Sequence, residues 1–128
     1  MSRRLDDLDP RFKPVAIELL ARCVEAGFMV MVVDTLRTQA EHEDNVRRGV
    51  SWTLRSKHLD GLAIDIAPWE TYALHGPDKL QWDAADPVWL KIGQIGESLG
   101  LVWGGRWKKT PDMGHFEMPT VPGGGVRV

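Results

Sequence analysis

Apolar residues recur at the three- and four-residue spacing of a helix in two stretches of the chain, residues 15–24 and 88–99. Each stretch follows an Asp-Pro pair, which favours a helix start with Asp as the cap and Pro in the first turn. Each stretch also ends at a glycine, a common helix terminator. The pattern therefore predicts one helix from Pro10 to Ala26 and another from Pro87 to Leu99.

A third helix is predicted from Gln39 to about Arg48, because Thr38 can cap its start and acidic residues lie in its first turns. His42 lies on this helix. We expect His42 to be a solvated or hydrogen-bonded helix residue, and a role near a binding cleft is the alternative.

Short apolar runs predict the strands. Residues 28–33 form a continuous apolar run of six, typical of a strand buried on both faces. Residues 62–67 form a second run, interrupted only by Asp65, and shorter strands are expected at 101–103 and from His115. We therefore predict an α+β fold with about three helices packed on one small, mostly antiparallel sheet.

Composition narrows the class of protein. The chain has 128 residues, of which 43% are apolar, and this fits one domain with one core. The net charge of −2 does not favour a nucleic-acid surface, and no apolar run approaches the ~20 residues of a membrane span. Cys23 is the only cysteine and is expected to be a buried thiol. We expect a monomer that binds neither nucleic acid nor membrane.

The two ends of the chain differ from its middle. Residues 1–7 are mostly polar or charged and carry no apolar segment, so no secretory signal is predicted. Residues 121–128 are rich in glycine and are expected to form a flexible tail behind a single domain of residues 1–120.

Asp65 is the central candidate for chemistry. Small residues, Ala63 and Ala67, share its face of the strand, which leaves room beside a carboxylate that needs a partner. His58 precedes this strand across a turn, and a second segment carries Asp112 and His115. Two histidines and one carboxylate are a common ligand set for a catalytic zinc. The sequence predicts one zinc ion bound by His58, Asp65 and His115, with Asp112 as general base for a water.

These residues form two motifs. Ser-x-His-x-x-Gly-x-Ala-x-Asp runs from Ser56 to Asp65, and Asp-x-x-His runs from Asp112 to His115. Together they resemble the zinc D,D- and L,D-peptidases of peptidoglycan, which include D-alanyl-D-alanine carboxypeptidases and the phage endolysins that are L-alanyl-D-glutamate peptidases. Residues 34–38 resemble the segment of that family that carries a substrate-facing arginine, here Arg37.

The resemblance implies that residues 1–120 are a zinc peptidase domain that cuts the L-alanyl-D-glutamate bond of the peptidoglycan stem peptide. It further implies a protein that stays in the host cytoplasm until it is released to the cell wall, because no signal peptide is predicted. A D-alanyl-D-alanine carboxypeptidase on the same scaffold is the first alternative. A non-catalytic, zinc-stabilised wall-binding protein is the second.

Arg37 and Ser56 each keep two interpretations. Arg37 either steadies an oxyanion or a substrate carboxylate, as the resemblance implies, or forms a surface salt bridge with Asp34 or Glu41. Ser56 either binds substrate or braces the turn that carries His58.

Glu117 either orients an imidazole of the site or is an exposed strand residue, since it shares the strand face of His115. His75 lies beside a Gly-Pro pair and is expected at the surface.

Overall fold

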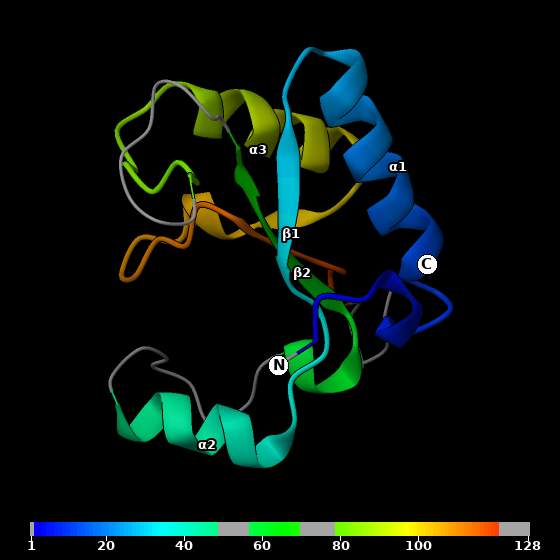
Figure 1. The fold of residues 1–128 in the computed structure, drawn as a ribbon, viewed down its shortest axis with the longest axis vertical. Coiled ribbons are helices and arrows are strands. Elements are labelled where there is room, and N and C mark those ends of the chain that lie inside the picture. The colour runs from blue at the N-terminus through cyan, green and yellow to red at the C-terminus, as the bar shows by residue number, and fades with distance from the viewer. Residues whose placement is uncertain (1, 49–56, 70–78, 121–128) are drawn as a thin grey trace.

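A computed structural model describes residues 2–48, 57–69 and 79–120 of the chain (Figure 1). Within these ranges the fold is α+β, as predicted, with three α-helices and one four-stranded antiparallel sheet. The helices are α1 (Lys13–Glu25), α2 (Gln39–Arg47) and α3 (Val88–Ser98), the strands are β1 (Val30–Asp34), β2 (Ala63–Pro68), β3 (Val102–Trp103) and β4 (His115–Glu117), and the short 3-10 helices are η1 (Leu5–Asp7), η2 (Lys57–Asp60) and η3 (Gly104–Arg106).

The sheet has the order β1-β2-β4-β3, and each neighbouring pair is antiparallel. β2 and β4 are therefore the interior strands, although they come from distant parts of the chain. α1 and α3 pack against each other and against the sheet, whereas α2 lies apart from them at the other end of the molecule (Figure 1).

The two faces of the interior strands differ in composition. Ile64 and Ile66 of β2 and Phe116 of β4 are fully buried in the hydrophobic core. The core is closely packed, since α3 has glycine at Gly96, where the ring of Phe116 leaves no space for a Cβ atom. Asp65 and His115 project from the opposite face, because side chains alternate along a strand.

Cys23 is fully buried on α1, as expected from the sequence. Burial raises the pKa of its thiol to about 11, because the charged thiolate would lose its hydration.

The two helices that follow Asp-Pro pairs begin later than predicted, although the carboxylate of each Asp accepts the N–H of the residue two positions on, Arg11 and Val88. α1 begins at Lys13 rather than at Pro10, since the backbone carbonyl of Asp9 closes a turn with the amides of the residues that follow. α3 begins at Val88, whose N–H donates to the carboxylate of Asp86 over 2.9 Å. By contrast, α2 follows the predicted cap and ends within a residue of the predicted position.

The predicted burial of residues 28–33 is wrong. β1 is an edge strand, and Met31 is 44% exposed. An apolar run alone does not distinguish an edge strand from an interior one. The register shifts between Val32 and Asp34, so that Val33 is an extra residue opposite β2. This bulge leaves Asp34 buried, with 2% of its surface exposed.

Gly96→Ala should lower the free energy of unfolding by about 1–3 kcal/mol, because an added Cβ would overlap the Phe116 ring in a packed core. Urea unfolding of the metal-free protein measures this loss. Gln94→Ala, on the exposed side of the same helix, should change it by less than about 0.5 kcal/mol. Equal unfolding midpoints for the two variants would contradict the packing described above.

Candidate metal centre

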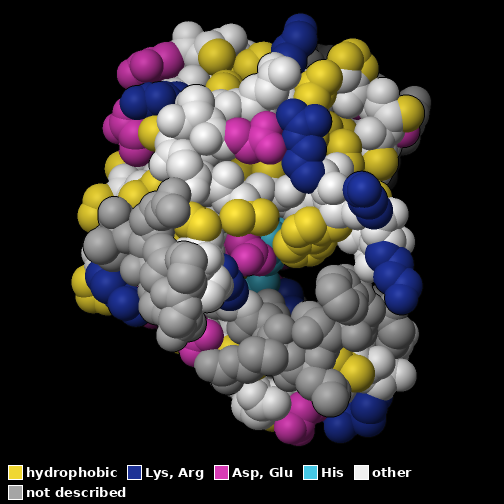
Figure 2. Space-filling view, turned by 180° about the vertical axis from the view of Figure 1, so that it is seen from behind, with side chains coloured by type: hydrophobic (Ala, Val, Ile, Leu, Met, Phe, Trp, Pro, Cys, Tyr) yellow, Lys and Arg dark blue, Asp and Glu magenta, His cyan; other side chains and the backbone are white. Residues whose placement is uncertain are grey.

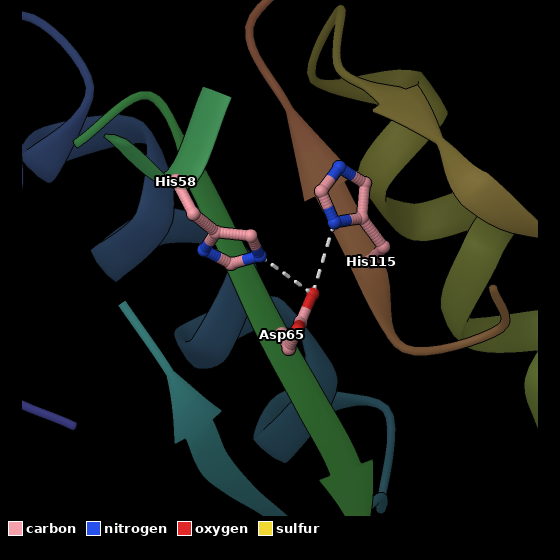
Figure 3. Close-up of side chains that lie close together, drawn as sticks. All are labelled: His58, Asp65 and His115. Carbon is pink, nitrogen blue, oxygen red and sulfur yellow. Dashed lines mark hydrogen bonds and ion pairs between the residues drawn. The ribbon is translucent and has the colours of Figure 1, made fainter. Parts of the chain in front are cut away.

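His58, Asp65 and His115 converge on one point (Figure 3). His58 Nε2 lies 3.1 Å from Asp65 Oδ1, and His115 Nδ1 lies 3.0 Å from the same oxygen. The three ligand atoms all lie within 4.8 Å of one another. The structure thus brings together the three residues that the sequence predicts as metal ligands.

The register of the interior strands produces this convergence. Asp65 of β2 pairs directly with His115 of β4, and directly opposite residues project from the same face of a sheet. Gly114 allows the close approach, because its carbonyl accepts the Ile66 N–H at 2.9 Å and a Cβ on Gly114 would overlap the Ile66 carbonyl. His58 enters from η2, immediately before β2.

Each imidazole uses its second nitrogen to contact an acceptor. His58 Nδ1 lies 2.7 Å from the carbonyl oxygen of Thr35, and His115 Nε2 lies 2.8 Å from Oε1 of Glu117. Because both partners accept hydrogen bonds, these two nitrogens carry protons, and the other nitrogen of each imidazole faces Asp65, where a metal would take the place of a proton. Two neutral imidazoles and one carboxylate fit a zinc ion.

The electrostatics of this cluster favour a positive charge at its centre. Burial alone would lower the pKa of His115, but hydrogen bonds to Asp65 and Glu117 outweigh it and raise the pKa to about 10. Burial alone would raise the pKa of Asp65, but hydrogen bonds from His115 and His58 hold it well below its usual range. Without a metal, a proton on His115 supplies that charge.

Asp112 lies beside the cluster, on the segment that leads into β4. Its backbone carbonyl accepts the His115 N–H at 3.2 Å, and its own N–H donates to the carbonyl of Gly104 at 3.0 Å. Asp112 is exposed as a residue, yet loss of hydration raises the pKa of its carboxyl group, and the negative charge of Asp65 raises it further. A carboxylate with a raised pKa is a better proton acceptor.

Aromatic and apolar side chains border the site. The ring centroids of Trp107 and His115 are 4.9 Å apart. Figure 2 shows histidine at the base of a hollow, with acidic and hydrophobic side chains around it. The two candidate histidine ligands are largely buried, since His58 and His115 are 2% and 4% exposed.

Arg37 forms the ion pair with Asp34 that the sequence offered as one of its alternatives, at 2.8 Å, but the pair is buried and not at the surface. Its side chain is 11% exposed, and Nη1 lies 3.2 Å from Nδ1 of His42. His42 is a buried, hydrogen-bonded helix residue, as expected. Asp34 Oδ2 lies 4.0 Å from Nδ1 of His58, so Asp34 links Arg37 to a predicted metal ligand.

Sequence reasoning missed two contributors to the site. The carbonyl of Thr35 orients His58, and a backbone group leaves no signal in side-chain chemistry. Lys57 forms an ion pair with Glu117, and its place next to His58 was the available signal. Ser56 and His75, like the predicted tail at 121–128, lie outside the described residues.

Comparison with known proteins identifies the family. Residues 49–118 match the family model described as D-alanyl-D-alanine carboxypeptidase. The chain is 31% identical to the L-alanyl-D-glutamate peptidase of Listeria phage A118, over 82% of this chain and 36% of that protein. It is 30% identical to the peptidoglycan L-alanyl-D-glutamate endopeptidase CwlK of Bacillus subtilis, over 88% of this chain and 74% of that one. For the L-alanyl-D-glutamate peptidase of Escherichia phage T5, the identity is 30% and the shares are 91% and 88%.

A solved structure has the same fold. The L-Ala D-Glu endopeptidase ChiX of Serratia marcescens superposes with a TM-score of 0.63 at 27% identity, over 88% of this chain and 81% of that one. The family model covers more than half of this chain, and it includes His58, Asp65 and His115. The resemblance seen in the two sequence motifs is therefore confirmed, and the chain belongs to the D-alanyl-D-alanine carboxypeptidase family of M15 peptidases.

Proposed function

We propose that the protein is a zinc-dependent endopeptidase that hydrolyses the L-alanyl-D-glutamate bond of the peptidoglycan stem peptide. The observation that carries this proposal is the convergence of His58, Asp65 and His115, with the second nitrogen of each imidazole held by an acceptor outside the cluster. Three relatives, two from phages and one from a bacterium, are named as peptidases for this bond.

His58 Nε2, Asp65 Oδ1 and His115 Nδ1 would hold one zinc ion, and three protein ligands leave a coordination position open. A bound zinc supplies Lewis acidity, which polarises a carbonyl and lowers the pKa of water from ~15.7 toward ~7. The ligands themselves contribute orientation, because Thr35 and Glu117 fix the direction of each imidazole.

Asp112 is the proposed general base. Its carboxylate would accept a proton from the attacking water and deliver it to the departing amine of D-glutamate, as a general acid. Its exposure and its raised pKa suit both steps, since the group must reach solvent and must hold a proton transiently.

Arg37 is proposed to stabilise the oxyanion or a carboxylate of the substrate. Asp34 and His42 occupy two of its nitrogens, which fixes the plane of the guanidinium, and Nε has no hydrogen-bond partner among the described residues. Ser56 is proposed to hydrogen-bond the substrate.

We also propose a monomeric enzyme, with residues 1–120 as its domain, that accumulates in the host cytoplasm and is then released to the wall. The phage origin of two relatives supports this route. No helix of the described residues is long and apolar enough to cross a membrane.

A D-alanyl-D-alanine carboxypeptidase is the second candidate, because the matching family model bears that description. Both reactions are amide hydrolyses and could use the same residues. Only the bond that is cut distinguishes them.

Digestion of purified peptidoglycan should release fragments with a new N-terminal D-glutamate, identified by mass spectrometry. Removal of zinc with a chelator should abolish the reaction, and added zinc should restore it. Loss of terminal D-alanine would instead support the carboxypeptidase. Absence of any cleavage by the zinc-loaded protein would support a non-catalytic role.

Asp112→Asn should lower kcat by about 10²–10⁴-fold, because the amide cannot accept a proton. Zinc content should stay at one per chain, since Asp112 is not one of the three ligands. The matched control is Asp6→Asn, which removes an exposed carboxylate far from the cluster in sequence and should leave kcat unchanged. Full activity in Asp112→Asn would show that the base is a different group.

Arg37→Lys should lower kcat/KM by about 10²–10³-fold, because lysine keeps the charge but loses the planar set of donors. Steady-state kinetics at saturating zinc, with unfolding curves alongside, separates this effect from a loss of stability. Arg106→Lys changes an exposed ion pair with Glu97 and serves as the control. Unchanged kinetics in Arg37→Lys would contradict a role in substrate or oxyanion binding and would leave Arg37 only its ion pair with Asp34.

A further inference from the structure

Lys57 and Glu117 form an ion pair that joins the two segments carrying the histidine ligands. Lys57 immediately precedes His58, and Glu117 follows His115 by two residues. One oxygen of Glu117, Oε1, lies 2.8 Å from His115 Nε2, and the other, Oε2, lies 3.2 Å from Lys57 Nζ. The carboxylate therefore contacts a ligand from one segment and a cation from the other.

The backbone holds this pair in place. Glu117 pairs across the sheet with Ala63, whose methyl side chain leaves room for the carboxylate on the face that carries His115. Lys57 Nζ also donates to the carbonyl of Met118, and the Met118 N–H donates to the carbonyl of Leu62 at 3.0 Å. The side chains of Glu117 and Lys57 are only 16% and 22% exposed, which excludes the interpretation of Glu117 as an exposed strand residue.

The two histidine ligands donate their second N–H to different kinds of acceptor. His58 donates to a neutral backbone carbonyl, whereas His115 donates to a carboxylate. A carboxylate accepts a stronger hydrogen bond from an imidazole than a neutral carbonyl does. It therefore fixes the proton on Nε2 of His115 and makes Nδ1 a better electron donor to a metal. Lys57 balances the charge of Glu117, which would otherwise be a partly buried and isolated anion.

We propose that Glu117 and Lys57 are a positioning pair that fixes the tautomer and orientation of His115 and thereby sets the zinc affinity of the site. The proposal rests on the zinc site of the proposed function. Glu117 acts through His115 and Lys57 acts through Glu117, so neither needs to touch the substrate. Their effect should appear in metal binding even when no substrate is present.

The test is the zinc dissociation constant of the purified chain, measured by competition with a chromogenic chelator. Glu117→Gln keeps the shape of the side chain but removes its charge, and should weaken zinc binding by about 10–100-fold. The absorption spectrum of the cobalt-substituted protein should also shift, because the ligand field of His115 changes. Glu97→Gln, which removes a carboxylate paired with Arg106 elsewhere, should leave both readouts unchanged.

Lys57→Met should weaken zinc binding less than Glu117→Gln does, because the carboxylate remains but loses its anchor. In the double variant, Lys57→Met should add little to the effect of Glu117→Gln, since the lysine acts through Glu117. Melting curves of the metal-free variants measure folding separately. If the pair had only a structural role, the variants would have a lower melting temperature but an unchanged affinity for zinc.

The outcomes separate this inference from the proposed function. If the wild-type chain binds no zinc, the zinc site itself is wrong, and this inference is overturned with it. If the wild-type chain binds zinc and Glu117→Gln binds it equally well, the positioning role is overturned while the peptidase proposal stands. If the effects of the two substitutions on zinc affinity add fully in the double variant, the claim that Lys57 acts through Glu117 is overturned.

Discussion

The carboxylate of Asp65 is the charge that the surrounding structure must accommodate. It lies on an interior strand, so water reaches it poorly, and an unpaired charge in such a place is costly. Two imidazoles approach one of its oxygens, at 3.1 and 3.0 Å. On the other side, Asp34 of β1 is directly opposite, and two carboxylates facing each other would repel. Arg37 neutralises Asp34, which allows Asp65 to keep its charge for a metal.

The two faces of the interior strands have different roles: one packs in the core, and the other carries the residues of the candidate site. One face carries Ile64, Ile66 and Phe116, which are fully buried in the core beneath α3. The opposite face carries Asp65 and His115. Because the same backbone serves both faces, packing in the core fixes the register, and the register fixes the distance between ligands. The precision of the site therefore derives from apolar contacts that lie away from it.

The sequence was sufficient to single out three residues that the fold brings together, and insufficient to find the groups that support them. The convergence of His58, Asp65 and His115 could be predicted because motif spacing and a lone acid in an apolar strand are local signals. The place of β1 in the sheet could not be predicted, because strand order depends on pairing between distant segments. The apolar run at residues 28–33 predicted a buried strand, whereas β1 is an edge strand with Met31 exposed. The role of Asp34 depends on a one-residue bulge, and apolar periodicity does not show where a bulge occurs. Each Asp-Pro pair marks the approach to a helix, but the helices themselves begin at Lys13 and Val88, after the proline.

The position of Cys23 has a practical consequence for studying this enzyme. The thiol is fully enclosed, and its pKa of about 11 leaves almost no thiolate at neutral pH. Toward alkylating dyes and spin labels, the folded chain therefore behaves as if it had no cysteine. A single cysteine introduced on the surface would carry a probe at that position alone, with no need to replace Cys23 first.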